Sequence, residues 1–548
     1  MCGIYGSINN PIPQFRYLQK TLNHRGPDGA DEYKYKNTYL FHSRLAIQDL
    51  SIKANQPFHY KHYTIIYNGE IYNHKELRKL CNGFDFQTES DTETLIALFE
   101  KYNNNLFEFL DGMFAFCILD KKKNKLLLAR DRAGKKPLYI YQFGDNFIFS
   151  SELNAIKTGI KNIEINDEAI QAYLRAGFFY KTTTPYKYVN ELEAGMVYEV
   201  DINSLKTYKT KYYEILDDYN KPNNLSFEET LLKLDITLHR SVKDRLESSD
   251  LEVGAFLSGG IDSSLVVALA SQYTKNLKTF TVKFDGAYDE SSLAKLTASK
   301  YGTDHHELNI SMNLRDDVEK IILNYGAPFM DSSAVPSYYV SQEAKKYVTV
   351  ILNGDGADEL FGGYRRYVPA ANGLIFIANK LRWLLKVLPR AHNKKSLYNY
   401  FYRLLAMSGK KGLEFYLSST SDIFEDIYQF DQNRIIDEID RFVLKIQNSN
   451  LSKLNQMLYS DFNLLLFSDL LIKMDIATMA HSIEGRSPFL SKYMLEFVPS
   501  IKDNFKIKGT NTKHILRELS KKYLPTDIIY QPKRGFEVPL VDWVEGDL

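Results

Sequence analysis

The sequence predicts two domains, an N-terminal α+β domain and a C-terminal α/β domain with a parallel sheet covered by helices. The chain has 548 residues, which is too long for a single hydrophobic core. Strand signals persist to about residue 213, whereas strands alternate with helices beyond residue 225. Residues 217–224 between them are polar, turn-rich and without periodicity. We therefore expect the domains to cover residues 1–215 and 225–548.

Composition restricts the classes of partner. The 69 Lys and Arg nearly balance the 68 Asp and Glu, leaving a formal net charge of +1, so the overall charge favours neither nucleic acid nor an acidic surface as partner. No apolar run approaches the ~20 residues of a membrane span, and no signal peptide is visible at the N-terminus. The three cysteines are too few and too scattered for a disulfide framework or a zinc site. We expect a cytoplasmic protein that binds neither nucleic acid nor membrane.

The N-terminus carries the first candidate for chemistry. Cys2 becomes the first residue once Met1 is removed, and a small second residue favours that removal. A chain-terminal Cys has its own general base, because the free α-amine titrates near pH ~8 beside a thiol near ~8.5. A lone thiol near a terminus is more often buried and structural, but the segments that follow favour the catalytic interpretation.

Those segments supply an acyl-transfer site for a primary amide. Arg44 can pair with the α-carboxylate of glutamine, and acidic residues can hold its α-ammonium. Asn68 and the Gly69 N–H, after a strand at residues 63–66, can stabilise the oxyanion that forms when a thiolate attacks the side-chain amide. Taken alone, Asn-Gly is foremost a hairpin signal. A helix through residues 95–102 follows, with its cap in residues 90–94.

In this order after an N-terminal Cys, the fragments resemble the class II glutamine amidotransferases. The resemblance implies an N-terminal-nucleophile sandwich, in which stacked antiparallel sheets lie between helices. It implies Cys2 as the nucleophile and Asn68 with Gly69 as the oxyanion hole. The residues that it places around glutamine are Arg44, Leu45, Ile47, Asn68, Gly69, Glu70 and Asp91. The match continues through strand-like segments to residue 153, which we expect to be structural.

The C-terminal domain opens with a helix from Ser226 to about Leu246, and its strongest motif then follows at residues 258–264, Ser-Gly-Gly-Ile-Asp-Ser-Ser. This motif lies between apolar runs, which predicts a strand, a tight turn and the start of a helix. Its glycines let an anion approach the main chain, and its hydroxyls stand where a helix N-terminus presents unpaired N–H groups. The loop lacks the Gly-Lys-Ser/Thr ending of a P-loop. The carboxylate of Asp262 repels phosphate unless a cation lies between them, which indicates Mg²⁺.

The loop resembles the pyrophosphate-binding loop of the ATP-pyrophosphatases, which adenylate a substrate and release pyrophosphate. Further strands are expected at residues 279–284, 305–308 and 347–352, and ligands bind at the C-terminal ends of such strands. The last strand leads into residues 353–364, where three carboxylates lie within five residues. The run differs from a calcium loop because it lacks a Glu at position twelve and follows a strand rather than a helix. It suits a Mg²⁺–pyrophosphate site.

Together, these motifs resemble the glutamine-hydrolysing asparagine synthetases over nearly the whole chain. The resemblance implies Mg²⁺ bound by Asp262 and Asp358, Asp355 near the acceptor or the acyl-adenylate, and a homodimer. Lys473, in a later matching segment, either balances phosphate charge or is an ordinary solvated helix lysine. The implied ATP contacts are Leu257, Ser258, Gly259, Gly260, Asp262, Ser263, Ser264, Val282, Asn353 and Gly354.

The resemblance implies one reaction with two sites. At the first, Cys2 forms a glutamyl thioester and releases ammonia. At the second, ATP with Mg²⁺ adenylates a carboxylate, and ammonia displaces AMP to give an amide. Because ammonia is mostly protonated in neutral water, a dry passage between the domains is required.

The sequence departs from the family at several positions. Residues 328–333 lack the Arg that some members use near aspartate, which leaves the acceptor open. Ile476 replaces a frequent basic residue and Ser491 replaces an Asp, which concerns details of the nucleotide site. The chain also ends at Leu548, where many relatives of this subtype continue with helical sequence. Aspartate is the expected acceptor, and its α-carboxylate needs a cation, for which the candidates are Lys473 and residues 365–366. The alternatives are a sugar acid or peptide carboxylate, or a non-catalytic binder of glutamine or nucleotide.

Overall fold

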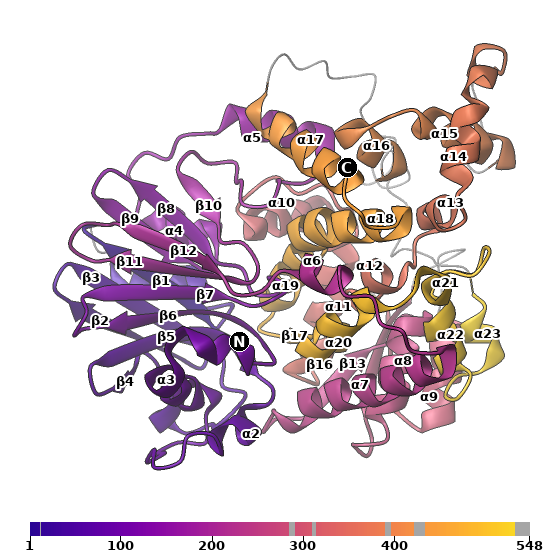
Figure 1. Cartoon of the computed structure of the whole chain (residues 1–548). Coiled ribbons are helices and arrows are strands. Elements are labelled where there is room, and N and C mark those ends of the chain that lie inside the picture. Colours follow the sequence, from indigo (N-terminus) through magenta and orange to yellow (C-terminus); the bar gives the residue numbers. More distant parts are fainter. Residues whose placement is uncertain (11–12, 284–290, 310–313, 390–395, 421–432, 532–548) are drawn as a thin grey trace.

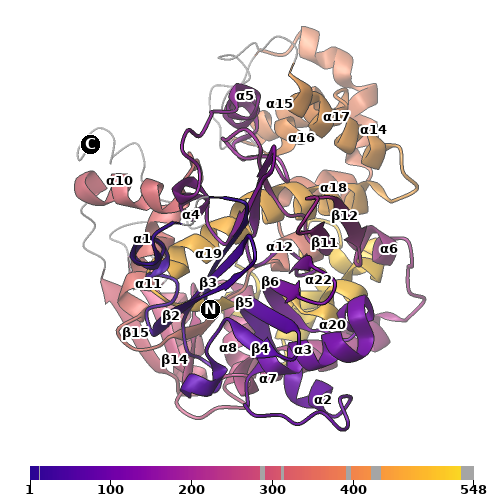
Figure 2. The same ribbon diagram turned by 90° about the vertical axis from the view of Figure 1, so that its left-hand side faces the viewer.

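The computed structural model describes the chain except for residues 11–12, 284–290, 310–313, 390–395, 421–432 and 532–548. Two bodies of different architecture pack against each other (Figure 1). The N-terminal strands form one body, and Figure 2 shows them facing the viewer with the C-terminal helices behind. Within the described residues, no helix is both long and apolar enough to cross a bilayer.

The N-terminal body is a sandwich of two six-stranded antiparallel sheets. The first has the order β10-β8-β9-β1-β3-β2 and the second β12-β11-β7-β6-β5-β4. The strands are β1 (Gly3–Ile8), β2 (Gly29–Tyr35), β3 (Thr38–Arg44), β4 (Phe58–Tyr60), β5 (Tyr63–Ile71), β6 (Gly112–Asp120), β7 (Lys125–Arg130), β8 (Tyr139–Phe143), β9 (Asn146–Ser150), β10 (Val189–Glu191), β11 (Met196–Asp201) and β12 (Thr207–Lys211).

Successive side chains along each strand point to opposite faces of its sheet, and this alternation produces the layers. In β5, Ile66 packs between the two sheets, whereas Ile65 and Tyr67 point to the opposite face, against helix α3 (Asp91–Tyr102). Helices α1 (Phe15–Leu22) and α4 (Leu153–Thr158) cover the outer face of the first sheet. The predicted sandwich of sheets between helices is therefore confirmed.

Local capping also agrees with the sequence. The side chain of Ser90 accepts a hydrogen bond from the Glu93 N–H at 3.3 Å and caps α3 as predicted. The Asn68-Gly69 pair, in contrast, lies inside β5 and not in a hairpin turn. The strand runs on to Ile71, five residues past its predicted end, because its partner β6 pairs with it over that whole length.

The C-terminal body contains a parallel sheet of five strands in the order β15-β14-β13-β16-β17. These are β13 (Val253–Phe256), β14 (Lys278–Lys283), β15 (Asp304–Asn309), β16 (Val350–Leu352) and β17 (Glu484–Arg486). Four were predicted, although residue 284 of the second lies outside the described residues. Strand β17 was missed because three residues that include two charges give no strand signal.

Helices cover both faces of this sheet. Helices α7 (Phe227–Glu247), α8 (Ile261–Ala270) and α9 (Ser291–Tyr301) lie on one face and α11 (Ala334–Ala344) on the other. A capping box of Ser226 and Glu229 begins α7 where a helix was predicted. The predicted linker is partly structured, since α6 (Ile215–Tyr219) overlaps it and buries Ile215 and Tyr219 in the C-terminal core.

Further helices extend the C-terminal body away from the sandwich (Figure 1). A π-helix, η5 (Phe462–Leu470), continues α18 into α19, and one helix of the N-terminal half, α5 (Asp167–Ala176), joins this group. The remaining helices are α2 (His74–Arg78), α10 (Leu314–Tyr325), α12 (Ala357–Phe361), α13 (Val368–Ala371), α14 (Leu374–Lys380), α15 (Leu397–Ser408), α16 (Gly412–Thr420), α17 (Arg434–Gln447), α18 (Lys453–Asp461), α19 (Leu471–Met479), α20 (Lys492–Phe497), α21 (Asp503–Lys506), α22 (His514–Ser520) and α23 (Thr526–Ile529). The 3₁₀ turns are η1 (Ile52–Ala54), η2 (Asn103–Glu108), η3 (Arg365–Tyr367), η4 (Arg382–Lys386), η6 (Pro488–Leu490) and η7 (Val498–Ser500).

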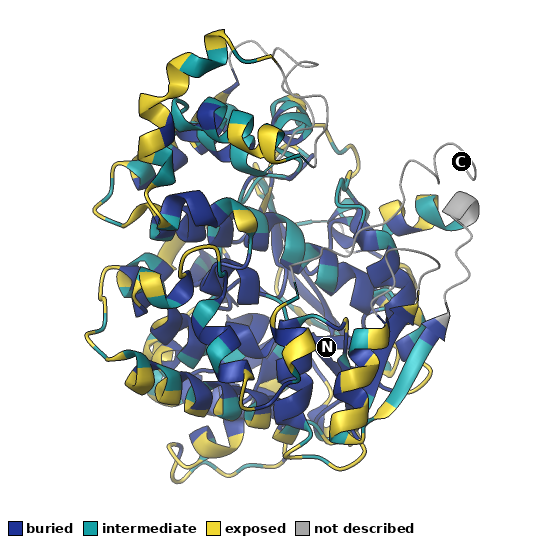
Figure 3. Ribbon diagram, turned by 90° about the vertical axis from the view of Figure 1, so that its right-hand side faces the viewer, coloured by how far each residue is buried: buried dark blue, intermediate teal, exposed yellow. Residues whose placement is uncertain are grey.

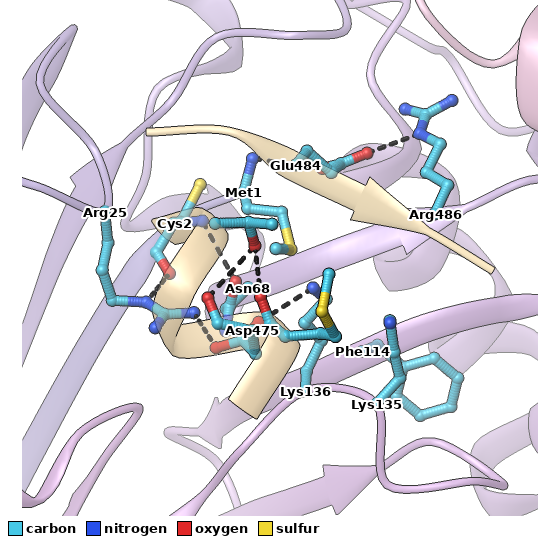
Figure 4. Close-up of polar contacts among 12 residues, drawn as sticks. Met1, Cys2, Arg25, Asn68, Phe114, Lys135, Lys136, Asp475, Glu484 and Arg486 are labelled. Carbon is cyan, nitrogen blue, oxygen red and sulfur yellow. Dashed lines mark hydrogen bonds and ion pairs between the residues drawn. The ribbon is translucent and has the colours of Figure 1, made fainter. Parts of the chain in front are cut away.

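Buried charges join the two bodies (Figure 4). Asp475 of α19 accepts from Arg25 Nη2 at 2.8 Å and from Lys136 Nζ at 3.0 Å, and all three side chains are inaccessible to solvent. Arg25 also pairs with Glu152 at 3.0 Å. Burial by itself raises the pKa of Asp475, but the charges of Arg25 and Lys136 outweigh it and lower that pKa to about 2. The carboxylate is therefore ionised at any pH at which the protein works.

Removing this carboxylate leaves two cations buried without their partner. Breaking a buried pair in this way costs about 3–5 kcal/mol, so we expect Asp475→Ala to lower the free energy of unfolding by that amount, measured by urea denaturation. The matched control is Glu100→Ala, which removes the partner of Lys61 in an exposed pair and is expected to leave the urea midpoint nearly unchanged. Equal midpoints for the two variants would contradict the assigned role.

Candidate active sites

Cys2 immediately precedes β1 and contacts Asn68 in the middle of β5 (Figure 4). Its N–H donates to Asn68 Oδ1 at 3.0 Å, and its carbonyl accepts from Arg25 Nε at 3.2 Å. Burial raises the pKa of its thiol, which the nearby N-terminal ammonium offsets only in part. The structure includes Met1, whose ammonium pairs with Glu484 at 3.2 Å. In this form of the chain, Cys2 does not carry the free amine that would serve as its base.

Asn68 has a donor that the fold does not use. Its Nδ2 is buried and has no hydrogen-bond partner among the described residues, which costs about 1–3 kcal/mol. Its Oδ1 is already fixed by the Cys2 N–H, so the orientation of the amide is set. At the next residue, a Cβ would lie 2.2 Å from the Met113 carbonyl oxygen, so only glycine fits at position 69. The unused Nδ2 supplies a donor of the kind that the predicted oxyanion hole requires.

A small cavity of about 30 Å³ lies beside Cys2. That volume holds about one water molecule and is smaller than glutamine, and Met1 forms part of its wall. Loss of Met1 would therefore both enlarge the cavity and free the Cys2 amine. The cavity is lined by Cys2 and by all the residues predicted to surround glutamine except Asn68, namely Arg44, Leu45, Ile47, Gly69, Glu70 and Asp91.

Charged side chains of both signs line this cavity. The loop after β3 holds the Arg44 guanidinium through Asn55 Oδ1 and the Ser51 carbonyl. Asp91 accepts from the Tyr67 hydroxyl at 2.8 Å. Burial raises the pKa of Asp91 to about 6, so its carboxylate remains mostly ionised at neutral pH and can attract an ammonium group. Arg44 and Asp91 thus have the charges that the two ends of an amino acid need.

The second site is a cavity of about 550 Å³ at the C-terminal ends of β13, β14 and β16. At the turn into α8, Gly259 has a φ of +79°, which favours glycine, and the Ser263 hydroxyl accepts from the Ser258 N–H. Ser264 is fully buried and does not line the cavity, so that predicted contact is not brought to the site. The predicted ATP contacts that do line it are Leu257, Ser258, Gly259, Gly260, Asp262, Ser263, Val282, Asn353 and Gly354.

A lysine to which the sequence assigned no role, Lys513, lies between the two predicted metal ligands. Lys513 Nζ is 2.6 Å from Asp262 Oδ2 and 2.6 Å from Asp358 Oδ1. The lysine precedes α22 and its side chain is buried. Lys513 lies 251 positions from Asp262 along the chain, so no local sequence pattern indicates this contact.

These carboxylates suit the predicted Mg²⁺. They share one cation already, and the buried Asp262 Oδ1 has no hydrogen-bond partner among the described residues. Within the described part of the chain, no cluster of three or more His, Cys, Asp and Glu side chains forms a metal site. Two carboxylates with phosphate oxygens and water are the ligand set that Mg²⁺ prefers over an all-protein cage.

The same cavity contains Lys473, one of the two candidates for the cation that pairs with the acceptor. Its Nζ lies 2.7 Å from Asp331 Oδ2 and 2.8 Å from Ser333 Oγ. Burial opposes its charge, but Asp331 and Asp469 hold the pKa of Lys473 above its ordinary value. It is not a solvated helix lysine. Residues 365–366 were the other candidate for the cation that pairs with the α-carboxylate of aspartate. That prediction was wrong, because Arg366 pairs with Asp461 at 2.8 Å and neither arginine lines the cavity.

The N-terminal body also contacts Asp355, one of the residues that line this cavity. Lys135 Nζ lies 2.9 Å from Asp355 Oδ2, which accepts from Asn353 Nδ2 at 2.8 Å as well. Lys135 lies next to the Lys136 that binds Asp475, and no sequence pattern indicated its contact with Asp355. Asp355, predicted near the acceptor, is therefore positioned by both domains.

The two bodies and their sites define a two-domain protein that joins an amidotransferase domain to a nucleotide-binding synthetase domain. Residues 1–213 match the family described as glutamine amidotransferase domain, and residues 233–548 match asparagine synthase. The chain belongs to the asparagine synthase family.

Curated relatives cover most of the chain. Asparagine synthetase [glutamine-hydrolyzing] 1 of Bacillus subtilis is 33% identical to this chain, over the whole of this chain and 88% of the relative's length. A putative asparagine synthetase [glutamine-hydrolyzing] 2 of Methanocaldococcus jannaschii is 39% identical over 67% of this chain and 76% of its own length. A solved glutamine phosphoribosylpyrophosphate amidotransferase from B. subtilis aligns with 58% of this chain and 70% of its own, at 17% identity and a TM-score of 0.31, which carries no argument.

Lys513 provides a test of the second site. We expect Lys513→Ala to lower ATP-to-AMP turnover by about 100-fold or more, because the site loses the cation that compensates Asp262 and Asp358. Glutaminase activity is measured in parallel and stays unchanged. Lys508→Ala, an exposed lysine of the same loop, is the matched control. Wild-type turnover in Lys513→Ala would show that the side-chain ammonium of Lys513 has no part in the reaction.

Proposed function

We propose that this protein is a ligase that makes asparagine from aspartate, with glutamine as the nitrogen donor and ATP with Mg²⁺ as the energy source. Glutamate, AMP and pyrophosphate are the other products. The observation that carries the proposal is the presence of two separate sites in one chain. A buried nucleophile lies beside an unused amide donor, and a lysine bridges two carboxylates in a nucleotide-sized cavity. The two relatives named above are called glutamine-hydrolysing asparagine synthetases.

The first half-reaction follows from the groups around Cys2. After Met1 is removed, the α-amine takes the thiol proton, and the thiolate attacks the side-chain amide of glutamine. Asn68 Nδ2 and the Gly69 N–H donate to the oxyanion, and ammonia leaves as the thioester forms. Water then releases glutamate. Arg44 and Asp91 hold the two charged ends of glutamine, so only the amide reaches the sulfur.

The second half-reaction takes place in the larger cavity. Asp262 and Asp358 would hold Mg²⁺, which when bound neutralises the charge of the phosphates. The loop at residues 258–263 surrounds the phosphates, and Lys513 compensates the pyrophosphate as it leaves. Aspartate lies with its α-carboxylate near Lys473, and its side-chain carboxylate attacks the α-phosphorus. Ammonia then displaces AMP from the acyl-adenylate.

We also propose that the enzyme works in the cytoplasm as a homodimer. Both points rest on the family resemblance. Analytical ultracentrifugation at several protein concentrations tests the oligomeric state, and a mass that stays at 63.4 kDa throughout would reject the dimer.

Cys2→Ala separates the two half-reactions. We expect it to abolish glutaminase activity and glutamine-dependent synthesis, while synthesis with added ammonium salts continues, because the thiol serves only to release ammonia. Asparagine is quantified by mass spectrometry with either nitrogen source. The control, Cys81→Ala, removes another buried cysteine and should keep both activities. Loss of ammonium-dependent synthesis in a folded Cys2→Ala protein would refute the two-site account.

The acceptor is tested by product stoichiometry. We expect AMP and asparagine to form in equal amounts when aspartate, glutamine, ATP and Mg²⁺ are all present, and neither to form without aspartate. ADP with phosphate as products would overturn the role of the phosphate loop. AMP release with a sugar acid or a peptide carboxylate, and none with aspartate, would establish the alternative acceptor.

Lys473→Ala adds a residue-level check on the acceptor. Removing a charge-assisted contact to a bound carboxylate costs about 1.5–3 kcal/mol, so KM for aspartate should rise at least tenfold while KM for ATP changes little. An equal rise in both constants would assign Lys473 to the phosphates. The control is Lys453→Ala, which removes an exposed lysine outside this cavity.

A further inference from the structure

Large apolar side chains are exposed together on α14, the η4 turn and α15, the part of the molecule that projects farthest from the sandwich (Figure 1). We call this surface the apolar patch and define it by Phe376, Ile377, Trp383, Val387, Leu397 and Phe401. Leu397 is 87% exposed, Val387 69% and Phe376 66%. Figure 3 shows exposed ribbon gathered on these upper helices. These elements pack against one another, and large apolar side chains exposed on neighbouring elements mark an interaction site.

The charge of the same segment is one-sided. Residues 374–408, which span α14 to α15, contain seven Lys and Arg and no Asp or Glu. Since the whole chain has a formal net charge of +1, the rest of the chain carries −6, the difference between +1 and +7. The overall balance that argued against an acidic partner therefore hides a strongly basic segment inside an acidic protein.

Basic and apolar groups are interleaved within the patch. Lys380, Arg382 and Lys386 are exposed on the same helical turns as the apolar side chains. Lys380 Nζ lies 4.5 Å from the centre of the Phe376 ring, so its apolar stem runs along the patch while its ammonium reaches water. Lys411 lines a neighbouring cavity of about 400 Å³ together with Phe376.

We propose that the apolar patch docks this enzyme on an anionic membrane surface. Short helices with Trp, Phe and Leu on one side and Lys and Arg beside them bind at the boundary between headgroups and acyl chains. Anionic lipids of the cytoplasmic leaflet attract each basic residue near the surface. The patch would insert from one side, without a spanning helix.

Other partners fit these residues less well. Nucleic acid binds basic surfaces through aromatic side chains that stack on bases, and the aliphatic Ile377, Val387 and Leu397 supply no stacking. A second copy would place the same basic segment against itself across a two-fold axis, where like charges repel. A membrane satisfies both the apolar and the basic groups at once.

The test is flotation of the full-length protein with vesicles of phosphatidylcholine alone or mixed with phosphatidylglycerol. We expect binding to the anionic vesicles only, and weaker binding as salt rises. Lys380→Glu with Lys386→Glu should lower the partition coefficient at least tenfold, since each lysine near the surface contributes substantially. Trp383→Ser with Val387→Ser should lower it as well. The matched controls are Lys20→Glu with Lys275→Glu and Leu232→Ser with Ile236→Ser, which are exposed positions elsewhere and should bind as wild type.

A second readout follows Trp383 itself. The chain has two Trp residues, Trp383 and Trp543, so Trp543→Phe leaves Trp383 as the sole indole. Its emission should shift to shorter wavelength when anionic vesicles are added and not with neutral ones. ATP-to-AMP turnover without lipid should be unchanged in all the patch variants, which shows that they fold.

Four outcomes would overturn the proposal. They are no flotation with anionic vesicles at low salt, equal flotation of patch and control variants, flotation with neutral vesicles alone, and self-association or binding to an acidic protein that needs the patch when vesicles do not bind.

Discussion

The desolvated contact of Asp475 with Arg25 and Lys136 fixes how the two domains meet. Each of its members contacts a site residue or lies within two positions of a residue that does. Arg25 donates to the carbonyl of Cys2, Lys136 follows the Lys135 that reaches Asp355, and Asp475 is two residues from Lys473. A buried ion pair adds little net stability compared with apolar packing, but an unpaired buried charge is costly. Any other docking of the domains would leave such charges unpaired, so one arrangement is selected and both sites are aligned with it.

The two sites meet opposite electrostatic demands. The site around Cys2 needs charged groups for the two ends of an amino acid and an uncharged hydrogen-bond donor for the oxyanion. The buried Nδ2 of Asn68, which has no partner among the described residues, is such a donor. In the larger cavity, carboxylates that suit a metal ion repel each other and the phosphates. Lys513 compensates Asp262 and Asp358, so this acidic site can fold and still receive a tetra-anionic ligand with its metal. Parallel strands bring these groups together because their C-terminal ends share one edge.

Charge organisation also matters on the outer surface. A net charge near zero describes the average of the chain, whereas the field at a surface depends on where the charges lie. Helix α14 and the η4 turn place the exposed Lys380, Arg382 and Lys386 beside exposed apolar side chains, on the part of the molecule farthest from the sandwich and away from both sites. Docking through this region would leave the Cys2 cavity and the nucleotide cavity unchanged.

The sequence by itself determined the features that are local. Periodicity predicted α7, α3 with its Ser90 cap, and four strands of the parallel sheet, because a helix or strand is set by neighbouring residues. Contiguous motifs predicted the phosphate loop and the surroundings of Cys2 for the same reason. Only the tertiary structure placed Asn68 inside a strand, added β17, excluded Ser264 from the cavity and paired Arg366 with Asp461. It also gave Lys513 its partner 251 positions away and Arg25 its partner 450 positions away. Such pairings depend on which buried charges the closed fold leaves facing each other, and no local stretch of sequence contains that information.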